Sequence, residues 1–209
     1  MKLSIVGFGN VGQALARRWS AAGHEVTVCV RDPQAPRKQA AAAPMGASLE
    51  PLNHASRNAV VLLAIPWRTV AEVVPQLGDL AGKIVLDCTN PVNPELTHLT
   101  LGFERSAGEI LAEMLPTARI VKIFNTNGSS NMENPQYGDH RVTMLYAGDD
   151  AGANQIGAQL ARDIGFEPVY LGPLRESRLL EPLAMAWIKL ARERRLGREF
   201  ALDVVRREA

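Results

Sequence analysis

The chain has 209 residues, 46% of them hydrophobic, which is enough for one domain with a full core and a small appendage. Its net charge is +1 and 5% of its residues are aromatic, so we expect no nucleic-acid partner, because nucleic-acid binding needs an electropositive face. No apolar run reaches the roughly twenty residues that cross a bilayer. A strand pattern that starts with the chain leaves no room for a signal peptide, so we expect no membrane partner and a cytoplasmic location.

The first thirty-one residues predict a βαβ unit. The apolar run Lys2–Val6 leads into the pattern Gly7-Phe-Gly-Asn-Val-Gly12, a helical pattern follows, and a second strand covers Glu25–Arg31. In a dinucleotide-binding unit the three glycines permit a tight turn, the approach of a pyrophosphate, and close packing of helix and strand, while the helix N-terminus offers N–H groups to the phosphates. The alternative is a glycine turn that binds nothing. We predict cofactor binding by Gly7, Phe8, Gly9, Asn10, Val11 and Gly12.

The residue that closes the second strand indicates which cofactor binds. NAD enzymes place an acidic residue about twenty residues past the glycines, whereas an arginine accommodates the 2′-phosphate of NADP. Here Arg31 stands nineteen residues past Gly12, and Lys38 follows shortly after it. A planar, permanently charged guanidinium suits phosphate oxygens. We therefore predict NADP(H), with NAD left open because Asp32 could reach a ribose hydroxyl.

Further apolar runs and helical patterns alternate along the chain, which predicts an α/β, Rossmann-type, doubly wound and mainly parallel sheet. The expected strands are 59–65, 83–87, 119–124, 142–147 and 167–171. Helices are expected over 69–80 and 106–115, each opened by a capping box (Ser/Thr-x-x-Glu), over 151–164, and from 179 into a charged helical tail over 192–207; residues 35–44 read as a loop or short helix. The expected domains are an NAD(P)-binding unit, 1–175, and a helical extension packed on it, 176–209.

Polar or turn-forming residues follow several expected strands, at Ile65-Pro66, at Asn90-Pro91, at Asn125-Thr126-Asn127 and at 148–150. Ligands of open α/β sheets lie across the carboxyl ends of the strands, so these residues are candidates for the site. Asn, Pro and Gly are also the commonest turn formers, and turn formation alone is the alternative.

The sequence shows no team of catalytic acid and base. The four histidines have no Asp or Ser at a recognisable spacing, and the two cysteines, Cys29 and Cys88, are expected as core thiols with no metal-binding pattern. Direct hydride transfer between two bound heterocycles needs no such team, because the cofactors carry the chemistry. We therefore predict no catalytic side chain and no metal site.

Several blocks together resemble one family. Besides the glycine pattern these are Ala64–Trp67, Gly102–Ala107, Val121–Thr126, Gly148–Asp150, Gly172–Leu174 and Ser177–Pro182. The set is similar to the NADPH-dependent reductases of the deazaflavin coenzyme F420, and it also resembles the cytoplasmic reductase domain of the STEAP metalloreductases. Phe8 departs from the family pattern, which usually has a small residue or Thr there.

The resemblance implies that NADPH lies over the glycine turn, with Arg31 and Lys38 near the 2′-phosphate. It implies that Ile65, Pro66, Asn90 and Pro91 flank the nicotinamide, and that Asn125, Thr126 and Asn127 border a flavin-like or deazaflavin acceptor such as F420.

Two other functions remain open at this stage. One is an NADP(H)-binding sensor without turnover. The other is a small relative of the β-hydroxyacid dehydrogenases or pyrroline-carboxylate reductases, for which Lys189 is the single candidate lysine, although its position predicts a solvated helix face. A homodimer through the C-terminal helices is also expected, because Trp187 and its neighbouring leucines need cover.

Overall fold

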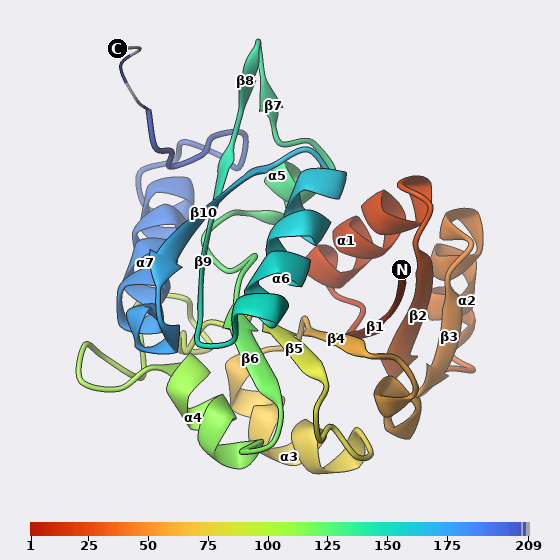
Figure 1. Ribbon diagram of the computed structural model, residues 1–209. Helices are drawn as coiled ribbons and strands as arrows, with labels where there is room; N and C mark the ends of the chain where they lie inside the picture. The colour runs from red at the N-terminus through yellow and green to blue at the C-terminus, as the bar shows by residue number, and fades with distance from the viewer. Residues whose placement is uncertain (206, 208–209) are drawn as a thin grey trace.

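The computed structural model describes residues 1–205 and 207. Its main sheet has eight strands in the order β10-β9-β6-β5-β4-β1-β2-β3, and all neighbours are parallel except β6 and β9 (Figure 1). This confirms the predicted mainly parallel α/β fold. The strands are β1 (Lys2–Val6), β2 (Glu25–Val30), β3 (Ser48–Pro51), β4 (Val60–Leu63), β5 (Ile84–Asp87), β6 (Arg119–Lys122), β9 (Thr143–Gly148) and β10 (Glu167–Gly172).

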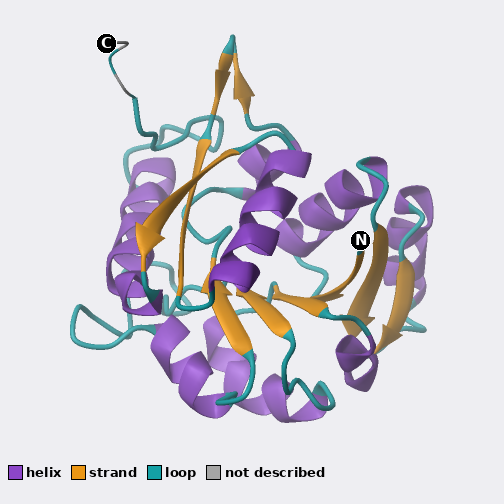
Figure 2. Ribbon diagram, in the orientation of Figure 1, coloured by secondary structure: helices purple, strands orange, loops and turns teal. Residues whose placement is uncertain are grey.

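Helices cover both faces of the sheet, as Figure 2 shows, and each face has its own core. Leu15 and Trp19 of the first helix and Leu160 of the sixth are fully buried in one core, whereas Val73 and Leu111 lie in the other. The helices are α1 (Asn10–Ala21), α2 (Pro36–Ala42), α3 (Val70–Val73), α4 (Ala107–Met114), α5 (Ser129–Glu133), α6 (Ala151–Asp163) and α7 (Ser177–Arg192). No helix in this part of the chain is long and apolar enough to span a bilayer.

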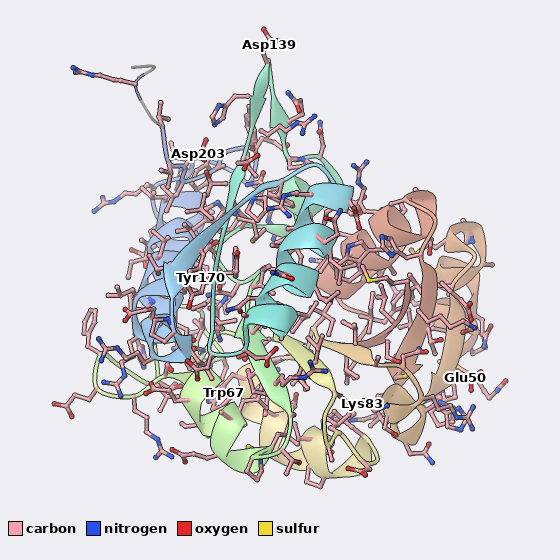
Figure 3. The ribbon with its side chains drawn as sticks, in the orientation of Figure 1. Glu50, Trp67, Lys83, Asp139, Tyr170 and Asp203 are labelled. Carbon is pink, nitrogen blue, oxygen red and sulfur yellow. The ribbon has the colours of Figure 1, made fainter. Side chains whose placement is uncertain are left out.

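The seven strands expected from the sequence are present, to within a few residues at their ends. Sequence patterns missed two features: the short edge strand β3 and a small hairpin of β7 (Gln136–Tyr137) and β8 (His140–Arg141), whose tip is marked by Asp139 in Figure 3. Both are too short for a clear alternation of apolar and polar residues to show.

The two predicted capping boxes have opposite outcomes. At α4 the box is present, because Ser106 Oγ accepts the Glu109 N–H at 3.2 Å and Glu109 Oε2 accepts the Ser106 N–H at 3.0 Å. The predicted helix over 69–80 is present only in part, as the four residues of α3 with 3-10 turns on both sides, and its predicted cap was wrong, because Thr69 Oγ1 donates to the Pro66 carbonyl. Pro75 lies inside this segment and has no N–H for a helical hydrogen bond.

Arg178 of α7 extends the α4 cap. Its Nε and Nη2 lie 2.9 and 2.7 Å from the two carboxylate oxygens of Glu109, a bidentate pair that ties the start of α7 to the start of α4. The hydrogen bonds from Arg178 and Ser106, stronger together than the opposing effect of burial, hold the pKa of the Glu109 carboxyl down at about 2. Glu109 is therefore ionised across the physiological range.

Of the two helical segments predicted at the C-terminus, the structure contains the first and not the second. Helix α7 forms, but the chain after Arg192 is irregular, so the expected helix over 192–207 was wrong; residues 206, 208 and 209 lie outside the described part. Arg195 and Gly197 have positive φ angles of 58° and 76°, which end helical geometry. The tail turns back, and Phe200 stacks on Trp187 at 5.1 Å between ring centroids and accepts the Trp187 indole N–H at 3.1 Å.

Trp187 is 9% exposed beneath this tail. The uncovered tryptophan from which a dimer was expected is thus covered by the chain itself. The dimer stays a prediction for which Trp187 no longer argues, although Leu179 of α7 is 51% exposed, and the division into units 1–175 and 176–209 also stays a prediction.

Candidate functional site

The turn between β1 and α1 brings the backbone of two strands together. Gly7 has a φ of +104°, and a Cβ on it would lie 2.4 Å from the Ala64 carbonyl oxygen. A Cβ on Gly12 would lie 2.4 Å from the Gly7 carbonyl oxygen. Both glycines are therefore required by the packing of the protein on itself. Gly9 differs, because beyond its two chain neighbours no atom of the protein lies within 4 Å of its Cβ position, so its open side is free for the approach of a ligand.

Gly9 is also the N-cap of α1, and this helix end is left open. In the described part of the chain no side chain caps it, and its first turn carries no acidic residue. The first intrahelical hydrogen bond runs from the Gln13 N–H to the Gly9 carbonyl. The three N–H groups before it, those of Asn10, Val11 and Gly12, lie in the first turn of the helix and therefore have no partner within it. Those amides and the helix dipole favour an anion at this point.

A cavity of about 310 Å³ lies beside this turn, across the carboxyl ends of β2, β1 and β4, which are neighbours in the sheet. Six of the predicted cofactor residues line it together: Gly7, Phe8, Arg31, Lys38, Ile65 and Pro66. Further walls come from Cys29, Val30, Leu52, Thr69 and Val73, so most of the lining is apolar, and Arg31 and Lys38 are its two cationic residues.

Both cationic residues of the lining have partners within the protein. Arg31 Nη2 lies 3.3 Å from Glu72 Oε2 in an exposed ion pair, and Lys38 Nζ lies 3.5 Å from the Asp32 carbonyl oxygen. The Asp32 carboxylate accepts the Gln34 N–H at 3.1 Å and does not line the cavity. Asp32 Oδ1 thus helps to form its own turn, and the other carboxylate oxygen remains exposed.

The remaining predicted residues lie at the next strand ends. Asn90 follows β5 and Asn125 follows β6, and the two side chains pair: Asn90 Nδ2 donates to the Asn125 carbonyl at 2.9 Å, and Asn125 Nδ2 donates to Asn90 Oδ1 at 3.0 Å. Pro91 is buried beside them. None of these three lines the 310 Å³ cavity, so they extend the strand-end row beyond it.

Three more predicted residues, Asn10, Thr126 and Asn127, also lie outside the 310 Å³ cavity. Asn127 Nδ2 donates to the Thr143 carbonyl at 3.3 Å, and Thr126 faces a small cavity of about 140 Å³ under the C-terminal tail. Asn10 lines a separate cavity of about 390 Å³ between α1, α5 and the tail. The turn at 148–150 lies beside the amino ends of the other strands, opposite the remaining candidate residues, because β9 runs antiparallel to β6.

Sequence reasoning missed a buried charge cluster behind the paired asparagines. Lys122 is fully buried, and its ammonium lies 3.0 Å from Asp87 Oδ2 and 2.8 Å from Glu181 Oε1. Burial acts to lower the pKa of Lys122, but the two carboxylates outweigh it and raise that pKa, so the amine stays charged. The available signal was that Asp87 and Lys122 each end a strand directly after buried apolar residues; they are register partners.

The described residues offer no nucleophile or acid–base team in the cavity. Burial, with a smaller effect of nearby carboxylates, raises the pKa of the Cys29 and Cys88 thiols to about 12, so both stay protonated. Three histidines do have carboxylate partners that the sequence did not reveal, namely His24 with Asp163, His54 with Glu50 and His140 with Asp203, but none lines the cavity. Lys189 pairs with Glu193 on the surface, as expected of a solvated face.

Comparisons with known proteins agree with this geometry. Residues 2–91 match the sequence profile of the family described as NADP oxidoreductase, coenzyme F420-dependent. The metalloreductase STEAP3 of Rattus norvegicus is 30% identical over 186 residues, which are 88% of this chain and 36% of the metalloreductase. The chain therefore spans about a third of that relative's length.

Solved structures share the whole fold. A protein from Arthrobacter sp. FB24, described as a candidate F420-dependent NADP-reductase, superposes with a TM-score of 0.90 at 26% identity and covers 99% of this chain and 100% of its own. A hypothetical protein from Sinorhizobium meliloti has a TM-score of 0.75 at 31% identity over 83% of this chain and 86% of its own. An imine reductase of Streptomyces aurantiacus, at 20% identity and a TM-score of 0.65 over 91% of this chain and 62% of its own, shows the common fold alone.

The open helix end and the residues that line the adjoining cavity all lie within residues 2–91, the segment that matches the family of coenzyme F420-dependent NADP oxidoreductases.

Proposed function

We propose that this NADP-dependent oxidoreductase transfers a hydride between NADP(H) and a flavin-like or deazaflavin acceptor. The observation that carries the proposal is the pairing of two features at one sheet edge. The α1 N-terminus is open above Gly9, and next to it lies a cavity whose lining includes Arg31 and Lys38. A dinucleotide has its charges in the same order, a diphosphate in the middle and, in NADP, a third phosphate on the adenosine ribose.

The residues present fit this cofactor. The amides of Asn10, Val11 and Gly12 would hold the diphosphate against the bare side of Gly9. Arg31 and Lys38 would hold the 2′-phosphate, for which Arg31 must leave its exposed pair with Glu72. Phe8, which departs from the family pattern, lines the cavity beside Gly7 and narrows it there.

The nicotinamide end would follow the row of strand ends. The cavity already reaches Ile65 and Pro66 after β4, and β5 and β6 come next in the sheet. Asn90 and Pro91 would therefore flank the nicotinamide, and Asn125, Thr126 and Asn127 would border the acceptor. These amide and hydroxyl groups can orient a heterocycle by hydrogen bonds without adding a charge.

Hydride transfer between two bound heterocycles needs no catalytic side chain. NADPH supplies the hydride when bound, and the protein's part is to hold donor and acceptor in contact and to exclude water. The protonated thiols of Cys29 and Cys88 fit this role, because they add no nucleophile near the site. The deazaflavin acceptor is supported by the family match and by the similarity to the Arthrobacter protein.

Absorbance of the nicotinamide band, followed by stopped flow, tests the function. With NADPH bound, a deazaflavin such as F420 or a flavin such as FMN is expected to cause rapid loss of the band. An ordinary aldehyde or ketone serves as the control and is expected to leave it unchanged. Tight NADPH binding with no oxidation by either heterocycle would contradict the proposal and favour a sensor without turnover.

Arg31→Ala tests the choice of cofactor. We expect NADPH binding to weaken by about 1.5–3 kcal/mol, the size of a hydrogen bond to a charged group, while NADH binding stays nearly unchanged. Isothermal titration calorimetry with both nucleotides measures the difference. Arg37→Ala is the matched control, because Arg37 is exposed on the same segment and does not line the cavity. Equal losses for NADPH and NADH would refute the assignment of Arg31 to the 2′-phosphate.

A further inference from the structure

We propose that Lys122 is a positioning residue for the nicotinamide end of the site: its buried ammonium ties the ends of β5 and β6 to α7 and so fixes the paired side chains of Asn90 and Asn125. This inference rests on the proposed function, because it needs a nicotinamide at these strand ends.

The ammonium of Lys122 joins two neighbouring strands at their last residues. Asp87 ends β5 and Lys122 ends β6, and the two are register partners. Lys122 Nζ lies 3.0 Å from Asp87 Oδ2 and donates to the Thr89 carbonyl at 2.6 Å. Asp87 Oδ1 in turn accepts the Thr89 N–H at 2.9 Å. The turn that leads from β5 toward Asn90 is therefore held by Lys122 and Asp87 together.

Glu181 connects the same ammonium to the helical layer. Its Oε1 lies 2.8 Å from Lys122 Nζ, and its two oxygens accept the N–H groups of Ala107 and Gly108, at the start of α4, at 3.0 and 3.1 Å. The cluster holds one ammonium and two carboxylates, all nearly fully buried. The α4 amides help to balance the second carboxylate, so every charge in the cluster has a fixed partner.

The paired asparagines are attached to this cluster on both sides. Asn90 stands three residues after Asp87, and Asn125 stands three residues after Lys122. Asn125 Nδ2 donates to the carbonyl of Leu180 at 3.1 Å, and Leu180 directly precedes Glu181. The ammonium and the amide pair thus hold the same turn of α7, and the position of each constrains the other.

The backbone between Lys122 and Asn125 includes a residue in an unfavourable conformation, Phe124. Phe124 has a φ of +63°, a conformation that a bulky side chain adopts only when its surroundings impose it. Its ring is buried and meets Trp19 edge to face at 5.5 Å. With Phe124 fixed by its ring and Lys122 fixed by the cluster, the turn that carries Asn125 is held in one geometry. Without the ammonium, the unfavourable backbone conformation of Phe124 is held by the packing of its ring alone.

Two nucleotides separate a positioning role from a merely structural one. Adenosine 2′,5′-bisphosphate contains the groups expected at Arg31 and Lys38 and lacks the nicotinamide, whereas NADPH contains both ends. In Lys122→Met the affinity for the bisphosphate is expected to stay within about twofold, and NADPH is expected to bind about tenfold more weakly, the loss of about one hydrogen bond. The emission of bound nicotinamide should also shift toward that of free NADPH. Folding is checked by circular dichroism.

Glu181→Gln provides a second variant should Lys122→Met not fold. It keeps an acceptor oxygen for the ammonium and removes one buried charge, so a smaller loss in the same direction is expected. The matched control is Arg178→Gln, which breaks the other ion pair between α7 and α4 and leaves the cluster intact.

Each outcome decides between the alternatives. A loss confined to NADPH in the Lys122 and Glu181 variants, absent from Arg178→Gln, supports the inference. Unchanged affinity for both nucleotides in the two cluster variants overturns it, and so does the same NADPH-specific loss in Arg178→Gln, which would report general loosening of α7. If the unmodified protein binds neither nucleotide, the proposed function itself fails, a result distinct from either of these.

Discussion

Replacing Gly9 by valine is expected to abolish binding of NADPH and NADH while leaving the protein folded. The Cβ position of Gly9 has no neighbour within 4 Å, and its φ of −77° and ψ of −172° suit a β-branched residue. The added methyl groups would occupy the space in front of the α1 amides, where the diphosphate is proposed to lie. Two lost hydrogen bonds to a charged group, at about 1.5–3 kcal/mol each, already weaken binding more than about a hundredfold.

Calorimetry with each nucleotide and a thermal melt of the free protein measure the two parts of this expectation. Gly102→Val is the control, because its Cβ position is also open and it lies in a loop away from the cavity. A Gly9→Val protein that binds NADPH as well as the unmodified protein would show that the diphosphate lies elsewhere. Loss of folding would show that Gly9, like Gly7 and Gly12, serves the packing of the chain.

Lys122→Met is expected to lower the free energy of unfolding by about 3–5 kcal/mol, the usual cost of removing one partner from a buried ion pair. Methionine fills a similar volume, so little of the loss comes from a cavity. The cost arises because Asp87 and Glu181 stay buried without the ammonium that lies 3.0 and 2.8 Å from them. Both carboxylates are buried from solvent, with Asp87 0% and Glu181 2% exposed.

Urea denaturation of the free protein measures this change. Lys189→Met is the control: it removes an ammonium from an exposed pair with Glu193 on α7, and such pairs contribute about 0–1 kcal/mol. A Lys122→Met protein that is no less stable than Lys189→Met would mean that the buried carboxylates find other partners or take up protons. That result would also remove the physical basis for the inference that the Lys122 ammonium fixes the ends of β5 and β6.

The parts of the fold that could be predicted from the sequence are those fixed by local chemistry. The βαβ unit is local, since Gly7 and Gly12 serve one turn between adjacent elements. The α4 cap needs only Ser106 and Glu109, three residues apart. By contrast, Thr69 has the same spacing and forms no cap, because its hydroxyl donates to the Pro66 carbonyl, and the proline six residues later lies where the α-helix has already ended.

In the candidate site, too, the residues that could be predicted are those placed by local structure. Arg31 and Lys38 lie near the glycine turn because one βαβ unit brings them there, and the cavity includes both. The Asn90–Asn125 pair and the Glu72 partner of Arg31 join segments 35 and 41 residues apart. The cluster of Asp87, Lys122 and Glu181 needs the order of the strands and the path of α7, neither of which a single sequence pattern encodes.

The reversal of strand direction at β9 has a practical use. Because β9 and β10 run against the other six strands, the start of α6 opens on the rim opposite the proposed nucleotide. Gln155 is exposed there, and the two native thiols are held protonated by pKa values of about 12. A cysteine introduced at Gln155 would therefore take up a maleimide dye selectively, and the dye would report domain motion or assembly without obstructing cofactor exchange.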